Sequence, residues 1–126
     1  MNALVNANLE KAGSLLADEY IGYGPASTDS TTRKMVLNTW KRNYMNQVNR
    51  KVGFVNNSFT VLQGNLKGDW VSTWGNYSCT ISDKNIKVPF QYTARIAEGK
   101  IVTDRIYYDM SNVLQTLGYK FSGPFK

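Results

Sequence analysis

The sequence contains no histidine. This absence removes the commonest general base, the Ser-His and Cys-His nucleophile pairs and the usual zinc sites. If the protein is an enzyme, its acid and base chemistry therefore falls to carboxylates, tyrosines or lysines. Cys79 is the single cysteine, which excludes an intrachain disulfide framework and a cysteine-rich metal site. We expect no metal and no cofactor, and we expect Cys79 to be a small buried residue in a strand.

Long apolar runs are also absent. No window approaches the roughly eighteen uninterrupted apolar residues of a membrane span, and the N-terminus lacks the basic-then-apolar pattern of a secretory signal. We therefore expect a cytoplasmic protein with no membrane partner. The chain has 126 residues, of which 42% are hydrophobic and 13% aromatic, enough to bury a core without metals or disulfides. This predicts one domain spanning residues 1–126.

Acidic residues are missing between Asp29 and Asp69, although the net charge of the chain is +6. The basic residues in this stretch are Arg33, Lys34, Lys41, Arg42, Arg50, Lys51 and Lys67. A solvated helix face is the interpretation that we favour. A nucleic-acid surface is disfavoured because the stretch has no Gly-rich, RNP-like or zinc-finger feature. A positive rim that steers an acidic small molecule toward a cleft is a third interpretation.

The first part of the chain has helical spacing. Residues 1–16 predict two short helical pieces, interrupted near residues 6–8. The turn formers of residues 22–30 predict a loop, after which Ser30 or Thr31 can cap a helix that runs to about Val48. The apolar stripe of this helix consists of Val36, Leu37, Trp40, Tyr44 and Val48. Basic residues lie nearer its opposite side.

From Gly53 onward the hydrophobic period changes to two. Residues 54–66, 69–81, 87–99 and 100–109 read as four strands joined by short turns, which is typical of an antiparallel meander. Residues 110–117 predict a closing helix, with Gly118 as its left-handed cap. Helices followed by adjacent strands predict an α+β fold with helices on one face of a curved sheet.

Several motifs in this order carry a family resemblance: "LLADEYIGYGP", read as a helix ending in an aromatic-bearing turn, then "GDWVSTWGNY", "AEGKI" and "YYDMSNVLQTLGY". The chain resembles the SnoaL-like members of the nuclear transport factor two-like superfamily. The resemblance implies a cone: a strongly curved antiparallel sheet of four to six strands wrapped around three helices, with an internal pocket and commonly in homodimers. Relatives begin with a longer first helix, so we expect the first helix here to be truncated.

Asp109 is the candidate catalytic residue. The resemblance implies this role, because the matching Asp of the cyclases removes a proton from the carbon next to a carbonyl. In an extended strand, Asp109 shares a face with Arg105 and Tyr107, whereas Asp104 and Tyr108 share the other face. If the first face lines a pocket, aromatic walls would desolvate Asp109 and raise its pKa. The alternative, left open, is that Asp109 is the N-cap of the helix from Met110.

Aromatic and polar residues supply the candidate ligand-binding set. Its members are Trp40, Tyr44, Phe90, Tyr92, Arg105, Tyr107 and Tyr23. The aromatic residues among them are equally compatible with an ordinary core. Tyr23 stands where many relatives have a His, so one polar pocket group differs. Trp70 and Trp74 share one strand face, and the pattern does not distinguish a pocket lining from a dimer interface.

The sequence and the resemblance together predict a small-molecule protein. It would be a lyase, isomerase or cyclase in which Asp109 abstracts a proton and Tyr44 or Tyr92 stabilises the enolate. Its partners would be a hydrophobic or aromatic small molecule and a second copy of the chain. The epoxide hydrolase activity is disfavoured because Arg95 is followed by Ile96 and Ala97, and the dehydratase activity because histidine is absent. The alternative is a non-catalytic ligand-binding or dimerisation domain.

Overall fold

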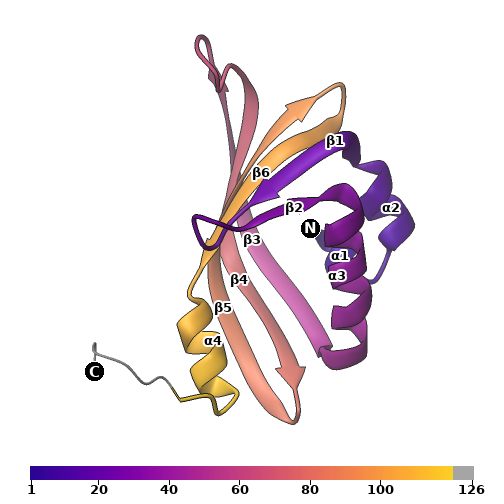
Figure 1. The fold of residues 1–126 in the computed structure, drawn as a ribbon, viewed down its shortest axis with the longest axis vertical. Coiled ribbons are helices and arrows are strands. Elements are labelled where there is room, and N and C mark those ends of the chain that lie inside the picture. Colours follow the sequence, from indigo (N-terminus) through magenta and orange to yellow (C-terminus); the bar gives the residue numbers. More distant parts are fainter. Residues whose placement is uncertain (121–126) are drawn as a thin grey trace.

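The computed structural model describes residues 1–120 and consists of a curved, unclosed sheet of six strands with four helices (Figure 1). Residues 121–126, the end of the expected domain, lie outside the described part. The elements are α1 (Asn2–Val5), α2 (Leu9–Ser14), β1 (Leu16–Tyr23), β2 (Ser30–Thr32), α3 (Arg33–Asn46), β3 (Val48–Val61), β4 (Gly68–Ile81), β5 (Lys84–Ala97), β6 (Lys100–Tyr108) and α4 (Met110–Thr116). This confirms the predicted α+β cone.

The strand order in the sheet is β2-β1-β6-β5-β4-β3. All neighbours are antiparallel except β1 and β6, which are parallel and join the first strand to the last. Helices α1, α2 and α3 lie against one side of the sheet, and α4 lies on the other side beside β5 (Figure 1). The predicted meander corresponds to β3 through β6, and three of its strands are 14 residues long.

Local signals in the sequence account for the start of α3, the β4–β5 turn and the end of α4. The Thr32 hydroxyl accepts a hydrogen bond from the Met35 N–H at 3.2 Å and caps α3, one or two residues beyond the predicted caps. The β4–β5 turn places Ser82 and Asp83 at positive φ, as a tight hairpin requires. Gly118 follows α4 with φ of +99°, in agreement with the predicted left-handed cap.

The first strand differs from the prediction. Residues 16–23 form β1, whereas the motif "LLADEYIGYGP" predicted a helix ending in an aromatic-bearing turn. Their burial alternates irregularly, because the β1–β6 register shifts between Leu16 and Ile21. The resulting spacing of buried residues, including Leu16 and Tyr20 at i and i+4, resembles that of a helix. Tertiary pairing with β6 therefore overrides the local pattern.

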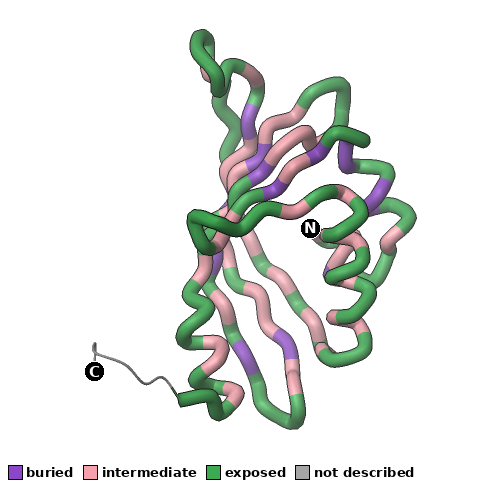
Figure 2. The backbone as a smooth tube through the Cα atoms, in the orientation of Figure 1, coloured by how far each residue is buried: buried purple, intermediate pink, exposed green. Residues whose placement is uncertain are grey.

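Buried residues lie on α1, α2, β1, β4, β5 and β6, with some of them apart from the others on the lower part of the sheet (Figure 2). The buried hydrophobic residues are Val5, Ala12, Leu16, Ala17, Tyr20, Trp70, Cys79, Ile86, Phe90 and Ala94. Cys79 is buried in a strand, as predicted. In the part of the chain that the structure describes, every helix is too short or too polar to cross a bilayer.

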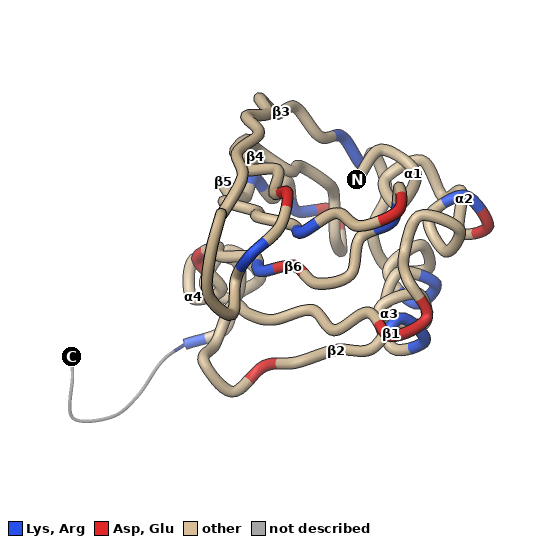
Figure 3. Tube along the Cα trace, turned by 90° about the horizontal axis from the view of Figure 1, so that it is seen from above, with Lys and Arg blue, Asp and Glu red and all other residues tan. Residues whose placement is uncertain are grey.

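The basic residues do not form one face. Arg33 donates two hydrogen bonds to the Gly13 carbonyl oxygen, at 2.9 and 3.1 Å, and so holds the end of α2. Arg50 donates to the Val5 carbonyl oxygen at 3.0 Å and to that of Gln47. Figure 3 shows Lys and Arg distributed over several elements, with Asp and Glu among them. The basic stretch of the sequence therefore supplies structural contacts as well as solvated charge.

Candidate functional site

A cavity of about 450 Å³ lies between helices α1–α3 and the inner face of the sheet. Aromatic and aliphatic side chains form most of its wall, among them Trp40 from α3, Tyr77 from β4, Phe90 from β5 and Ile106 from β6. A volume of this size is in the range of small-molecule sites.

Asp104 is the acidic residue that lines this cavity. Its side chain is 7% exposed. The Tyr20 hydroxyl from β1 lies 2.8 Å from both carboxyl oxygens, and the Tyr92 hydroxyl from β5 donates to Oδ2 at 2.6 Å. Three neighbouring strands therefore place one carboxyl and two phenols together at the inner face.

Burial changes the acidity of all three groups. Desolvation raises the pKa of Asp104 above its ordinary value, while the hydrogen bonds from Tyr92 and Tyr20 oppose this rise. Desolvation, and then the nearby Asp104 charge, raise the pKa of Tyr20 and of Tyr92. Both phenols therefore stay protonated near neutral pH and can donate hydrogen bonds to the carboxylate. A carboxylate with a raised pKa is a stronger base than an exposed one.

Gly22 makes room for this arrangement. It is the direct partner of Asp104 in the β1–β6 ladder. A Cβ at Gly22 would lie 2.2 Å from the Tyr20 hydroxyl oxygen and 2.6 Å from Asp104 Oδ1. These distances are too short for any side chain, so the contact between Tyr20 and Asp104 depends on glycine at this position.

Other polar groups border the cavity without a protein partner among residues 1–120. They include the Trp40 indole N–H, the Asn43 amide and the Tyr23 and Tyr108 hydroxyls. Burial, and then the Asp29 charge, raise the pKa of Tyr108, so its hydroxyl is a donor at neutral pH. These groups are free to form hydrogen bonds with a ligand.

Four of the predicted binding residues border the cavity: Trp40, Phe90, Tyr92 and Tyr23. The Tyr23 ring itself lies near the Arg105 guanidinium, whose carbon is 5.5 Å from the ring centroid.

Tyr44 is not among the residues that line the cavity. Its hydroxyl donates to the Leu4 carbonyl oxygen at 2.5 Å, and the Arg50 guanidinium carbon lies 4.7 Å from its ring centroid. Tyr44 therefore holds α1 against α3.

The predicted pocket face of the last strand is corrected by the structure. Arg105 and Tyr107 are exposed on the outer face, whereas Asp104, Ile106 and Tyr108 line the cavity. Aromatic and aliphatic residues occur on both faces of this strand, so its alternation alone does not show which face is inward.

Asp109 lies outside the cavity lining. It is the N-cap of α4, and its Oδ1 accepts a hydrogen bond from the Asn112 N–H at 3.1 Å. This is the capping geometry that the sequence analysis left open as an alternative.

Trp70 and Trp74 also lie outside the cavity. Trp70 is buried, stacks on Phe59 with ring centroids 6.2 Å apart, and donates from its indole N–H to the Leu66 carbonyl oxygen. Trp74 is 48% exposed on the outer face.

Sequence reasoning missed Tyr20 and Asp104 as site residues. Tyr20 lies in the motif that predicts a helix ending in a turn, and Asp104 lies on the strand face opposite the one that the sequence analysis expects to line the pocket. A signal for Asp104 was available, because it is a carboxylate in the middle of a strand, between Val102 and Ile106, rather than at its end. Acidic residues are rarely buried without partners, so a mid-strand carboxylate is a stronger indication of a polar site than a strand-end one.

Comparison with solved structures identifies the fold. A protein with the ketosteroid isomerase-like fold from Catenulispora acidiphila, whose structure contains trimethylamine, aligns with 96% of this chain and 92% of its own at 21% identity and a TM-score of 0.74. IdmH, a candidate polyketide cyclase from Streptomyces antibioticus, aligns over 94% and 92% at 17% identity and a TM-score of 0.72. A candidate SnoaL-like polyketide cyclase from Shewanella putrefaciens aligns over 95% and 91% at 10% identity and a TM-score of 0.73.

No family model and no curated protein matches the chain by sequence. The chain has the nuclear transport factor two-like fold of SnoaL-like and ketosteroid isomerase-like proteins, which confirms the fold expected from the resemblance.

Proposed function

We propose that the cavity binds a hydrophobic or aromatic small molecule with a carbonyl group, and that Asp104 removes a proton from the carbon next to that carbonyl. The observation that carries this proposal is the buried Asp104 carboxyl held by the Tyr20 and Tyr92 hydroxyls at an aromatic-walled cavity. The base is thus Asp104 rather than Asp109, which caps a helix outside the cavity.

The chemistry follows from the environment of the carboxylate. Desolvation makes Asp104 more basic, and the two phenols keep it ionised and oriented before the reaction. When Asp104 takes the proton, negative charge develops on the carbonyl oxygen of the substrate. A neutral donor on the cavity wall, Tyr108 or the Trp40 indole, can stabilise that charge. Tyr44 is not available for this role because its hydroxyl is bound to Leu4.

Exchange of carbon-bound hydrogen tests this proposal directly. The protein is incubated in D₂O with a panel of cyclic and aromatic ketones, and loss of the proton signal next to the carbonyl is followed by NMR. We expect catalysed exchange of at least one ketone, and a loss of about 10²-fold or more in Asp104→Asn, because general bases typically contribute 10²–10⁴-fold. Asp109→Asn is the matched control, because it makes the same chemical change outside the cavity and Asn still caps a helix. Equal exchange by wild type and Asp104→Asn would refute the proposal.

Non-catalytic binding is the alternative. One observation favours it: Asp104 is the only acidic residue among the described residues that line the cavity, so a second acid or base must be a phenol. An anionic carboxyl among aromatic rings also suits an amine cation, and a similar fold contains trimethylamine. Saturable binding of trimethylamine by the wild type, lost in Asp104→Asn and without exchange of any ketone, would support this alternative.

We also propose that the outer face of the sheet forms a homodimer. Val55, Trp74 and Tyr107 are 55%, 48% and 53% exposed, and the register places them on β3, β4 and β6 in one row, in which Gln91 is the polar member from β5. A row of large exposed apolar side chains is typical of an interaction surface. Light scattering after gel filtration should give twice the chain mass for the wild type and a monomer for Trp74→Glu. A dimer with a dissociation constant in the micromolar range would be populated at a protein concentration of about 100 μM. A wild type that is still monomeric at that concentration would contradict this assembly.

A further inference from the structure

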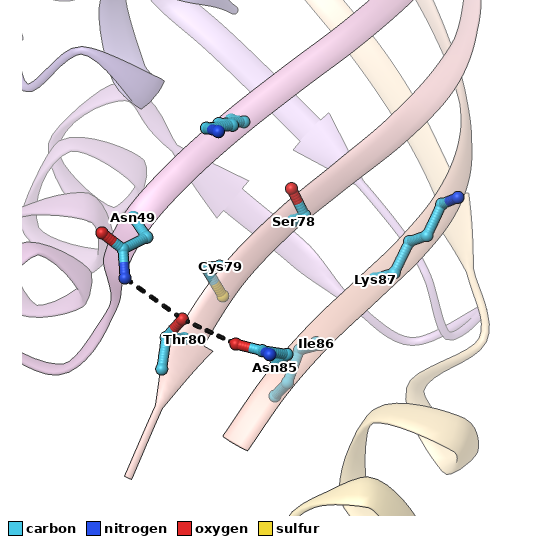
Figure 4. A pocket seen from close by; sticks show the side chains of 8 residues that line it. Asn49, Ser78, Cys79, Thr80, Asn85, Ile86 and Lys87 are labelled. Carbon is cyan, nitrogen blue, oxygen red and sulfur yellow. Dashed lines mark hydrogen bonds between the residues drawn. The ribbon is translucent and has the colours of Figure 1, made fainter. Parts of the chain in front are cut away.

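A second cleft, of about 300 Å³, lies among the ends of β3, β4 and β5 (Figure 4). Ser78 and Thr80 border it from β4. They alternate along the strand with Tyr77 and Cys79, which line the large cavity, so their side chains point to the opposite side of the sheet. The polar side of this cleft is therefore separate from the Asp104 site.

The polar side chains of the cleft present hydrogen-bond donors. Asn49 Nδ2 donates to Thr80 Oγ1 at 3.4 Å, and the Thr80 hydroxyl donates to Asn85 Oδ1 at 3.0 Å, a chain of contacts visible in Figure 4. Because the carbonyl oxygen of Asn85 is used in this chain, its amide NH₂ remains to donate outward. The Ser78 hydroxyl has no protein partner among residues 1–120 and is also free to donate.

Two lysines complete the cleft. The register pairs Ser78 with Lys51 on one side and with Lys87 on the other. Strands in a sheet are about 4.8 Å apart, so the two lysine backbones lie about 10 Å from each other across β4. Neither ammonium group has a carboxylate partner in the described residues, and the nearest acidic residue along the chain, Asp83, does not line the cleft. The cleft therefore combines two uncompensated positive charges with neutral donors.

We propose that this cleft binds a phosphate group, with Lys51 and Lys87 on either side of it and Ser78 and Asn85 donating hydrogen bonds. Charge-assisted hydrogen bonds from ammonium groups to phosphate oxygens are short and strong. An anion between the lysines also offsets their mutual repulsion. A phosphate suits these donors better than a carboxylate does, because its three or four oxygens can accept hydrogen bonds from several directions. The ligand class is a small phosphomonoester, and the proposal is independent of the chemistry at Asp104.

The test is a titration with inorganic phosphate at constant ionic strength, with chloride as the balancing ion. Backbone amide NMR signals of residues 78 and 85 report binding. We expect saturable shifts, and we expect Lys51→Gln/Lys87→Gln to weaken the affinity at least tenfold while its folded spectrum is retained, because both side chains are at the surface. Lys41→Gln removes one exposed lysine of α3, outside the cleft, and should bind phosphate as the wild type does.

Two outcomes would overturn the proposal. Linear, unsaturated shifts that are equal in the wild type and the double variant would indicate an adventitious ion only. Binding of vesicles containing an anionic phospholipid or of an oligonucleotide, without any saturable binding of inorganic phosphate or glycerol phosphate, would mean that the surface recognises a polymer or a membrane. Saturable binding of glycerol phosphate that depends on Lys51 and Lys87 would support a free phosphomonoester as the ligand.

Discussion

Tyr92 and Asp104 lie diagonally across the β5–β6 ladder, with the Tyr92 hydroxyl 2.6 Å from Asp104 Oδ2. The direct partner of Asp104 in this ladder is Ala94, which is buried. Because the Ala94 side chain is a single methyl group, the longer Tyr92 side chain can extend along the sheet to the carboxyl. Diagonal neighbours of this kind are within reach of aromatic side chains. A larger side chain at position 94 would therefore compete with Tyr92 for the space beside the carboxyl.

Tyr92→Phe should raise the pKa of Asp104 further. The Tyr92 hydrogen bond stabilises the charged carboxylate and so opposes the rise caused by burial. Loss of a hydrogen bond to a charged group should also lower the free energy of unfolding by about 1.5–3 kcal/mol. Carboxyl-carbon NMR across a pH titration measures the first effect and urea unfolding the second. Tyr107→Phe, on the outer face, is the control and should leave the Asp104 titration unchanged; an unchanged titration in Tyr92→Phe would argue against the hydrogen bond.

Asp104→Asn should change how stability depends on pH. The folded-state pKa of Asp104 is raised above its ordinary value of 3.8, so the folded protein binds the proton more tightly than the unfolded chain. The wild type therefore loses stability as pH rises from about 3.8 through the folded-state pKa of Asp104. Above that pKa, the contribution of Asp104 to the free energy of unfolding no longer changes with pH. Asn has no such proton. Urea unfolding between pH 3 and pH 8 should show the variant gaining stability relative to the wild type as pH rises; a pH-independent difference would contradict the raised pKa.

Gly22→Ala should destabilise the protein and disturb the site. The added Cβ would lie 2.2 Å from the Tyr20 hydroxyl oxygen, so Tyr20 or the β1–β6 pairing must move, at a cost of about 1–3 kcal/mol for overpacking. Gly53→Ala is the matched control in β3, because no atom lies within 4 Å of its added Cβ. Thermal unfolding compares the two variants. Equal melting temperatures would show that the space at Gly22 is not required.

Asp109→Ala should weaken α4 without affecting the cavity. Loss of the N-cap contact to the Asn112 N–H should cost about 1 kcal/mol. Asp109→Asn should retain most of that stability because Asn is also a good N-cap. Hydrogen exchange of α4 amides measures the local effect, and ligand affinity should be the same in all three proteins. A large loss of affinity in Asp109→Asn would return Asp109 to the candidate site.

The sequence predicted the long strands well and the site poorly, for physical reasons. The period of two is clearest in β5 and in the second half of β6, where more buried and more exposed residues alternate. In β1, by contrast, an irregular register produces a helix-like spacing, so Tyr20 was missed. In β6 the alternation was correctly read, but the choice between Asp104 and Asp109 depends on which face the helices cover. That choice is made by contacts distant in sequence.

The parallel pairing of β1 with β6 has a consequence for how the protein folds. Tyr20 and Asp104 are 84 residues apart in the chain. Closing so long a loop costs conformational entropy before the stabilising contacts between its ends can form. Contacts of high sequence separation slow folding, so the carboxyl and its first phenol should come together in a late step, after the β3–β6 meander has formed. A partly folded chain would then present an incomplete set of side chains around Asp104. The set of side chains around Asp104 is complete only after β1 has paired with β6.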